Sequence, residues 1–358
     1  MTSPPDLSSV RRIFVRAPNW VGDLVMATAA FARLRAAFPS AHITLGARPV
    51  LHGLLGGTDW FDEIVPTPRA GSLRGLWRQA RELRARRCDL AVVFPNSLET
   101  GLIPFLAGVP LRLGYRQGRP GLMNLGLKAR VRRRWWQRRM GPRRYAIPMP
   151  EYYRDLLDCL GIEGSAIHPI LRVTPDEKAW VDAHLEQLGV ATDERIVLLV
   201  VGANYGQSKL WMPDRFAAVA REFASRGYRA IVTVGPAEVE LGRKIASAAG
   251  VIGLFDPVLS LDRLKAMVAR SDLVITGDTG PRHLAVAFDR KVVCLMGPND
   301  RAYTEYCMDD TILIQKDHLP CVPCQRKVCP LGHHLCMKEI SVDEVVDAGQ
   351  QLLTLAAD

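Results

Sequence analysis

The chain has 358 residues, of which 48% are hydrophobic, and this is typical of a globular protein long enough for two domains with separate cores. No stretch approaches the roughly 18 consecutive apolar residues of a membrane-spanning helix, and residues 1–10 lack the apolar segment of a secretory signal. We therefore expect a cytoplasmic protein whose membrane contact is peripheral, at the inner membrane.

The net charge of +10 is concentrated in one part of the chain. Between Glu99 and Glu151 there is no acidic residue, but there are eleven arginines and one lysine, most densely over residues 130–144. Such a segment predicts an acidic partner, which can be a phosphate-bearing lipid, a nucleic acid or an anionic membrane face.

The first half alternates short apolar runs, which predict buried strands, with apolar patterns of helical period. In chain order we expect a strand at 13–15, a helix at 24–38, a strand at 43–45, an edge piece at 62–65, a helix at 73–87, a strand at 90–94 and a helix at 152–160. Residues 104–150 interrupt this alternation, and their content of Gly, Pro, Arg and aromatic residues predicts a basic insert in the first domain.

The second half repeats the alternation more regularly. We expect helices at 176–188, 213–226, 237–249 and 261–270, and strands at 196–201, 230–234, 273–275 and 292–296. This order predicts an α/β fold with two Rossmann-like doubly wound domains, residues 1–172 and 173–358, that face each other across a cleft. The final amphipathic helix, residues 342–355, can pack on the C-terminal domain or back on the N-terminal one.

Residues 273–283 contain a short apolar run, two glycines and a helix that is expected to begin near Pro281. The free N–H groups at such a helix start bind phosphate, and Arg282 and His283 add positive or donor groups close by. The alternative is an ordinary strand–loop–helix connection that is capped by Asp278 or Thr279.

Other polar residues follow predicted strands, where ligands of α/β sheets bind. Asp23 precedes a helix and can be its N-cap or a general base. Lys209 can be a surface lysine or a phosphate-binding one. Glu238 and Glu240 open a helix, where they can complement its dipole or accept hydrogen bonds from ribose hydroxyls.

Four cysteines cluster near the C-terminus. Their spacing, Cys-x2-Cys-x4-Cys-x6-Cys, is compatible with a structural zinc site, although cysteines also serve as small apolar groups. Disulfides are not expected in a reducing cytosol. The possible metal ligands are Cys321, Cys324, Cys329 and Cys336.

Several motifs resemble glycosyltransferase family nine. They are Asn-Trp-Val-Gly-Asp-Leu-Val from residue 19, Gly-Ala-Asn-Tyr-Gly-Gln-Ser-Lys-Leu-Trp from residue 202, Thr-Gly-Asp-Thr-Gly-Pro-Arg-His-Leu-Ala from residue 276, and Gly-Pro-Asn-Asp from residue 297. The third motif is the most specific, and the resemblance extends from about residue 11 to the C-terminus. The cysteine-rich segment also looks like the branch of this family that adds the second heptose of the lipopolysaccharide inner core.

The resemblance implies an inverting GT-B enzyme that requires no cofactor. It would move L-glycero-D-manno-heptose from its donor, ADP-heptose, to the first heptose of the lipopolysaccharide inner core, at the inner face of the cytoplasmic membrane. It implies that Asp23 is the catalytic base, and that the donor is bound by Lys209, Asp278, Thr279, Gly280, His283 and Glu240. We expect the acceptor to contact Asn19 in the first domain and Arg132, Arg133 and Arg134 in the basic insert.

The chemistry of these residues agrees with glycosyl transfer. A base must take the proton of the acceptor hydroxyl while the leaving diphosphate gains charge, which helix N–H groups and Lys209 can stabilise. The sequence has no Asp-x-Asp pair to hold a metal ion on the diphosphate, so no catalytic metal is expected.

Two other functions compete with this one. Another GT-B enzyme, such as a different core glycosyltransferase or a sugar-nucleotide epimerase, would share the fold; an epimerase needs acid and base groups on both faces of one sugar, and the first-domain loops offer mainly Asp23. A nucleic-acid-binding protein is suggested by Trp135 and Trp136 among the arginines, but no recognised nucleic-acid module is present, so no nucleic-acid partner is expected.

Overall fold

The computed structural model describes residues 6–119, 121–128, 131–132, 143–144, 146–202 and 206–354. The chain divides into two compact units, which we describe separately. Unit 1 contains Met1–His52 and Thr58–Pro169, and unit 2 contains Gly53–Gly57 and Ile170–Asp358. Residues 53–57 belong to unit 2 because the buried Lys265 donates to the carbonyls of Gly53 and Gly56.

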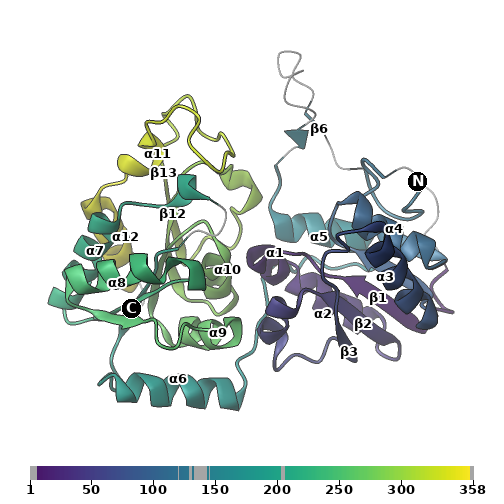
Figure 1. Ribbon diagram of the computed structural model, residues 1–358, viewed down its shortest axis with the longest axis horizontal. Helices are drawn as coiled ribbons and strands as arrows, with labels where there is room; N and C mark the ends of the chain where they lie inside the picture. Colours follow the sequence, from purple (N-terminus) through teal and green to yellow (C-terminus); the bar gives the residue numbers. More distant parts are fainter. Residues whose placement is uncertain are drawn as a thin grey trace. The chain divides into compact units, whose positions relative to one another are not determined.

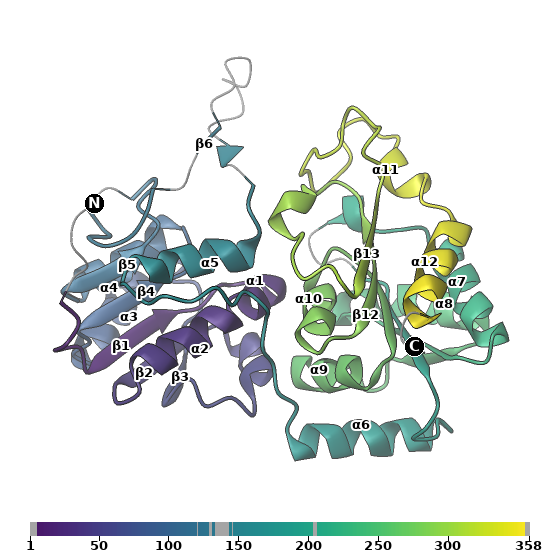
Figure 2. The same cartoon turned by 180° about the vertical axis from the view of Figure 1, so that it is seen from behind.

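Unit 1 is built on a parallel sheet with the strand order β3-β2-β1-β4-β5 (Figures 1 and 2). Its strands are β1 (Arg12–Arg16), β2 (His42–Ala47), β3 (Glu63–Pro66), β4 (Leu90–Val93) and β5 (Leu111–Gly114). Its helices are α1 (Val21–Met26), α2 (Thr28–Ala37), α3 (Leu73–Ala85), α4 (Leu98–Leu106) and α5 (Met149–Asp158). A short antiparallel pair, β6 (Val131–Arg132) and β7 (Arg143–Arg144), also belongs to it, and the 3-10 helix η1 (Pro49–Leu55) begins in unit 1 and ends in residues assigned to unit 2.

The helices of unit 1 cover both faces of the sheet, as doubly wound folds require (Figure 2). On one face, Leu76 and Leu83 of α3 and Ile103 of α4 form a core cluster with Phe14 of β1. On the other face, α2 and α5 pack around Phe94, whose ring lies edge-on to aromatic rings from both helices.

Unit 2 has a parallel sheet with the order β10-β9-β8-β11-β12-β13. Its strands are β8 (Ile196–Val200), β9 (Arg229–Thr233), β10 (Ile252–Leu254), β11 (Leu273–Gly277), β12 (Lys291–Met296) and β13 (Thr311–Gln315). Its helices are α6 (Pro175–Gln187), α7 (Pro213–Ser225), α8 (Val239–Ala249), α9 (Leu261–Arg270), α10 (Gly280–Ala287), α11 (Leu335–Lys338) and α12 (Val342–Thr354), with the 3-10 helices η3 (Gln207–Lys209), η4 (Pro236–Glu238) and η5 (Arg301–Tyr303).

The predicted alternation of strands and helices is confirmed in both units, with several differences. Helix α4 was not predicted from the sequence. The helix expected at 24–38 is two helices, α1 and α2, separated at Ala27. The region 104–150 is not wholly an insert, because it contains the end of α4 and the edge strand β5. The sequence did not predict β10 and β13, which lie at the two edges of the second sheet.

The final helix, α12, packs on unit 2, where Val345, Leu352 and Leu353 join the same core cluster as Phe223 of α7 and Leu273 of β11. This is packing on the C-terminal domain, one of the two possibilities that the sequence left open. Its apolar stripe is already buried by α7, β12 and β13 of its own unit. No helix in the described part of the chain is long and apolar enough to span a membrane.

Candidate active site

The loop from β11 to α10 lies at the middle of the second sheet, because β11 pairs with β8 on one side and β12 on the other. Helix α10 begins at Gly280, and its N-cap is Thr279, whose side chain makes no capping hydrogen bond. The hydroxyl of Thr279 instead lies 3.3 Å from that of Thr276. The N–H groups at the start of this helix are therefore not satisfied by a side-chain cap, as the phosphate-binding hypothesis requires.

Asp278 connects three loops at this edge of the sheet. The nitrogen of Lys209, in η3 after β8, lies 3.2 Å from one carboxylate oxygen, and Asn299, after β12, donates to that same oxygen. The fully buried Arg282 lies 3.3 Å from the other oxygen. Lys209 also donates to the main-chain carbonyl of Asp278 at 2.5 Å. The structure thus brings together Lys209 and Asp278, two residues predicted to hold the donor, with Arg282, which the sequence also placed beside this loop, and it adds Asn299.

The charges of this cluster are held in fixed states. Burial alone would raise the pKa of Asp278, but the positive charges of Lys209 and Arg282 outweigh it and hold that pKa well below its usual range. One carboxylate is thus shared by two buried cations. The cluster of these three side chains keeps a net positive charge, which favours an anionic ligand at the start of α10.

His283 is buried one residue beyond Arg282. Burial, followed by the positive charge of Arg282, lowers the pKa of His283 to about 3, so the ring is neutral at physiological pH. Its Nδ1 lies 2.7 Å from the hydroxyl of Tyr306. His283 therefore offers a neutral ring, held by Tyr306, rather than a positive charge.

Of the two candidate ribose ligands, Glu238 and Glu240, only Glu238 lies at the carboxyl ends of strands. A Cβ atom added to Gly202, just after β8, would lie 2.3 Å from a carboxylate oxygen of Glu238, and one added to Gly235, after β9, would lie 3.1 Å from it. Glu240, which the sequence favoured, is an exposed residue in the first turn of α8.

Asp23 lies in unit 1, in the first turn of α1, immediately after β1 and its loop. The N-cap of α1 is Trp20, so the N-cap interpretation of Asp23 is wrong. The partly buried carboxylate of Asp23 forms a hydrogen bond with the hydroxyl of Tyr153, a buried residue of α5. Burial, and then the charge of Asp23, raise the pKa of Tyr153 well above its usual value, so its hydroxyl is neutral. Tyr153 thus orients a carboxylate that keeps partial access to solvent.

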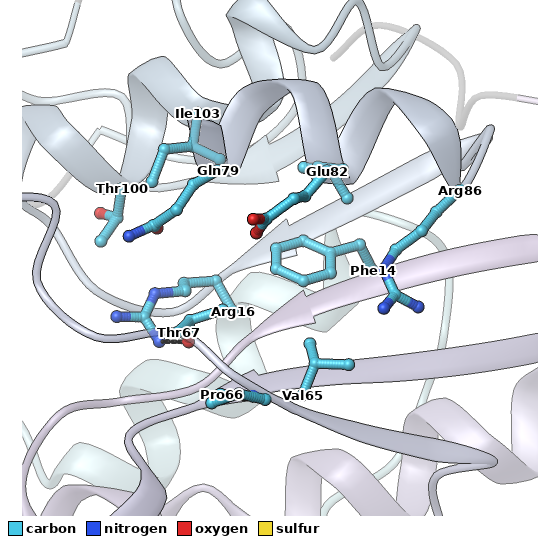
Figure 3. A pocket seen from close by; sticks show the side chains of 11 residues that line it. Phe14, Arg16, Val65, Pro66, Thr67, Gln79, Glu82, Arg86, Thr100 and Ile103 are labelled. Carbon is cyan, nitrogen blue, oxygen red and sulfur yellow. Dashed lines mark hydrogen bonds between the residues drawn. The ribbon is translucent and has the colours of Figure 1, made fainter. Parts of the chain in front are cut away.

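Asn19, the predicted acceptor residue, is linked to Arg16, a residue that the sequence did not single out. The Asn19 side-chain oxygen accepts a hydrogen bond of 3.1 Å from Arg16. Arg16 is 5% exposed, and burial lowers its pKa to about 10. It also lines a cavity of about 200 Å³ under α3, where it donates to Thr67 and where Gln79 and Glu82 project toward the sheet (Figure 3).

The remaining predicted residues are described only in part. Arg132 is in β6, paired with Arg143 of β7, but its side chain is outside the described part of the structure, as are Arg133 and Arg134. Their predicted role in acceptor binding therefore stays a prediction.

The four clustered cysteines are unpaired thiols. Among the residues that the structure describes, no three His, Cys, Asp or Glu side chains are placed to hold a metal ion, which gives no support to the possible structural site. Cys321 lies 4.0 Å from the ring of His333. Burial raises the pKa of Cys336 to about 11, whereas four main-chain N–H groups, from residues 331–334, outweigh burial and lower the pKa of Cys329.

Comparison with known proteins agrees with this geometry. Residues 76–335 match the model of glycosyltransferase family 9 (heptosyltransferase). The chain belongs to glycosyltransferase family 9. It is 27% identical to lipopolysaccharide heptosyltransferase 2 of Escherichia coli over 311 residues, which cover 82% of this chain and 84% of that protein. It is 25% identical to lipooligosaccharide heptosyltransferase 2 of Campylobacter jejuni over 96% of this chain and 98% of the relative.

Solved structures of this family share the fold. The structure of E. coli ADP-heptose LPS heptosyltransferase II has a TM-score of 0.76 and 24% identity, over 97% of this chain and 100% of that one. A family 9 glycosyltransferase from Veillonella parvula has a TM-score of 0.80 and 22% identity, over 98% and 99% of the two chains. The predictions of a GT-B fold with two Rossmann-like units and of a glycosyltransferase are confirmed.

Proposed function

We propose that this glycosyltransferase moves L-glycero-D-manno-heptose from ADP-heptose to the first heptose of the lipopolysaccharide inner core, with inversion at the transferred carbon. Relatives that align with most of the chain bear the name of heptosyltransferase 2. The observation that carries the proposal is the buried cluster of Lys209, Asp278 and Arg282 beside the start of α10, which suits a sugar nucleotide with a diphosphate.

In the donor site that we propose, Thr279 and the N–H group of Gly280, at the start of α10, bind the diphosphate together with Lys209. Asp278 keeps Lys209 and Arg282 in place and neutralises part of their charge. His283 contributes a neutral ring near the sugar, and Glu238, with Glu240 as the other candidate, accepts hydrogen bonds from the ribose. The positive groups stabilise the diphosphate as its negative charge increases in the transition state.

In the transfer step, the acceptor hydroxyl gives its proton to Asp23. The oxygen of the acceptor hydroxyl forms a bond to the anomeric carbon of the heptose. At the same time the bond from that carbon to the diphosphate oxygen breaks, and ADP leaves with the electron pair. Tyr153 holds the carboxylate of Asp23 in one orientation. A partly buried carboxylate with a fixed orientation suits a general base.

For the acceptor, we propose that Asn19 and the arginines of the basic insert contact the phosphorylated inner core, and that the enzyme works at the inner face of the cytoplasmic membrane. Replacing Arg132, Arg133 and Arg134 together with Ser should raise the Michaelis constant for the acceptor and reduce its salt dependence, with little change in the affinity for ADP.

The test of the function is mass spectrometry of an inner-core acceptor after incubation with the enzyme and ADP-heptose. We expect a gain of one heptose residue on an acceptor that already carries the first heptose. Transfer only to an acceptor that lacks heptose would assign the enzyme to a different core position. Conversion of the sugar nucleotide without an acceptor would indicate an epimerase instead.

A further inference from the structure

The outer surface of α3 and α4 combines exposed apolar and basic side chains. The inner side of α3 packs on the sheet through Leu76, Ala80 and Leu83. Its outer side carries Leu73 and Trp77, which are 77% and 57% exposed. Neither of these two side chains is needed for the core, so their exposure calls for another explanation.

The same side of α3 is strongly basic. Arg74, Arg78, Arg81 and Arg84 are all exposed, and Glu82 is the only acidic residue of the helix. Because helical neighbours are three or four residues apart, Leu73, Trp77 and Arg81 lie in one row, with Arg74 and Arg78 in the next. Among the described residues, no acidic side chain lies within ion-pair distance of Arg74 or Arg81, whereas Glu82 lies 3.9 Å from Arg78.

Helix α4 extends this surface. It packs beside α3 (Figures 1 and 2), and Arg84 donates hydrogen bonds to the last carbonyls of α4 and its C-cap. Leu98 and Phe105, seven residues apart and thus on one side of α4, are 56% and 45% exposed. The guanidinium of Arg112 lies 5.4 Å from the centre of the Phe105 ring, which adds another positive charge at this end.

We propose that the surface formed by the outer faces of α3 and α4 docks unit 1 on an anionic lipid bilayer. An indole and several leucine-sized side chains beside arginines suit the headgroup region, where apolar groups enter the interface and arginines contact lipid phosphates. Helix α12 differs in charge from α3, because it has three acidic residues, Asp343, Glu344 and Asp347, and no basic one.

This docking deepens the proposed function, since it relies on an acceptor that is carried by a lipid, but it makes a separate prediction. The enzyme should bind vesicles without donor or acceptor. Substitution of residues in the proposed catalytic or donor site, such as Asp23 and Lys209, should not change the binding to vesicles.

The test is co-sedimentation of the full-length enzyme with vesicles of phosphatidylethanolamine and phosphatidylglycerol. Replacing both Arg74 and Arg81 with Ser should lower the partition coefficient about 25-fold, at about fivefold for each arginine near an anionic surface. The matched control replaces Arg221 and Arg226 of unit 2, which changes the net charge equally and should have little effect. Equal losses in the two double variants would overturn the proposal, because they would show attraction by net charge alone.

The apolar part is tested with Trp77→Ser, against Leu188→Ser, an exposed leucine of unit 2, as the control. Trp77→Ser should weaken vesicle binding by about tenfold at high salt as well as low salt, because burial of apolar surface is not screened. Unchanged binding of Trp77→Ser would overturn insertion of this surface. A dimer in lipid-free solution that Trp77→Ser dissociates would assign the surface to self-association instead.

The outcomes separate docking from function. Transfer of heptose to a delipidated, soluble acceptor should proceed equally well in the wild type, in Trp77→Ser and in the double arginine variant. A chain that transfers heptose but does not bind vesicles would retain the proposed function and exclude the docking. A chain that binds vesicles through α3 but transfers no heptose would retain the docking and exclude the proposed function.

Discussion

Two aspartates that follow strands, one in each unit, have opposite environments. Asp278 is 5% exposed, and its two carboxylate oxygens are bonded to Lys209, Arg282 and Asn299. Asp23 is only partly buried, lies in the first turn of a helix, and is held by the neutral hydroxyl of Tyr153. Both lie within motifs that resemble the same family, but their surroundings differ in charge and in access.

The difference indicates what each carboxylate can do. Because Asp278 is surrounded by positive charge, its pKa lies well below the usual range and it is a poor proton acceptor, suited to holding other groups in place. Asp23 forms a hydrogen bond with an uncharged hydroxyl and is only partly buried, so its carboxylate can accept a proton from a substrate. We therefore propose catalysis for Asp23 and organisation of the donor site for Asp278, and each proposal can be tested.

The largest effect is expected for Asp23→Asn, which keeps the shape but removes the base. The turnover number should fall on the order of a hundredfold to ten-thousandfold, the usual contribution of a positioned base. ADP affinity, measured by calorimetry, should stay within about twofold, because the product nucleotide does not contact this group in the proposed mechanism. Near-normal turnover would remove Asp23 as the base.

Asp278→Asn should instead destabilise unit 2. Removal of one charge from a buried cluster leaves Lys209 and Arg282 without their anion and costs about 3–5 kcal/mol. ADP-heptose should also bind more weakly. Asp310→Asn is the matched control, since Asp310 forms a more exposed pair with Lys291, and its loss should cost less than about 1 kcal/mol in urea or thermal unfolding.

A smaller effect on stability, which depends on pH, is expected for His283, the residue next to Arg282. His283 has a folded-state pKa of about 3 against an ordinary 6.5, so below pH 6.5 the unfolded chain binds a proton that the folded chain does not. Its contribution to stability is therefore complete above pH 6.5 and is lost as the pH falls toward 3. His283→Gln should flatten the pH dependence of unfolding in this window; an unchanged slope would contradict a neutral buried ring.

Like His283, Asp278 stabilises the folded state less as the pH falls, but this loss occurs at a lower pH. Its depressed pKa stabilises the folded state above about pH 4, the ordinary range for aspartate, and this stability is lost as the pH falls further. In Asp278→Asn this acidic part of the curve should be missing, which distinguishes it from the His283 effect.

The smallest effect is expected for Tyr153→Phe, which removes the hydroxyl that orients Asp23. Turnover should fall by about fivefold to tenfold, as for loss of one hydrogen bond of about 1 kcal/mol, with the pH profile of kcat shifted as well. The donor Michaelis constant should stay the same. A merely structural role would lower the melting temperature without shifting the pH profile.

The sequence alone determined the α/β class, most of the central strands of both sheets and the position of the loop before α10, our candidate phosphate-binding loop. These depend on local signals: apolar runs for buried strands, helical periodicity, and the Gly and Pro residues around Pro281. Where those signals are weak the prediction was wrong, as at β5 and β10, short edge strands that are partly exposed and include glycine. For β13, the apolar residues 312–314 are such a signal, a short apolar run of the kind that indicates a strand.

The partners of the functional side chains were decided only by the tertiary structure. Lys209 and Asp278 are 69 residues apart in the chain, and they meet because β8 and β11 are neighbours in the sheet, an order that no local pattern specifies. In the same way, Tyr153 reaches Asp23 because α5 packs against α1. Glu238 rather than Glu240 lies over Gly202 because of the way that the loop after β9 turns into α8. Residue type and spacing can nominate candidates, but burial and neighbouring charge set their pKa values, and these depend on contacts between distant parts of the chain.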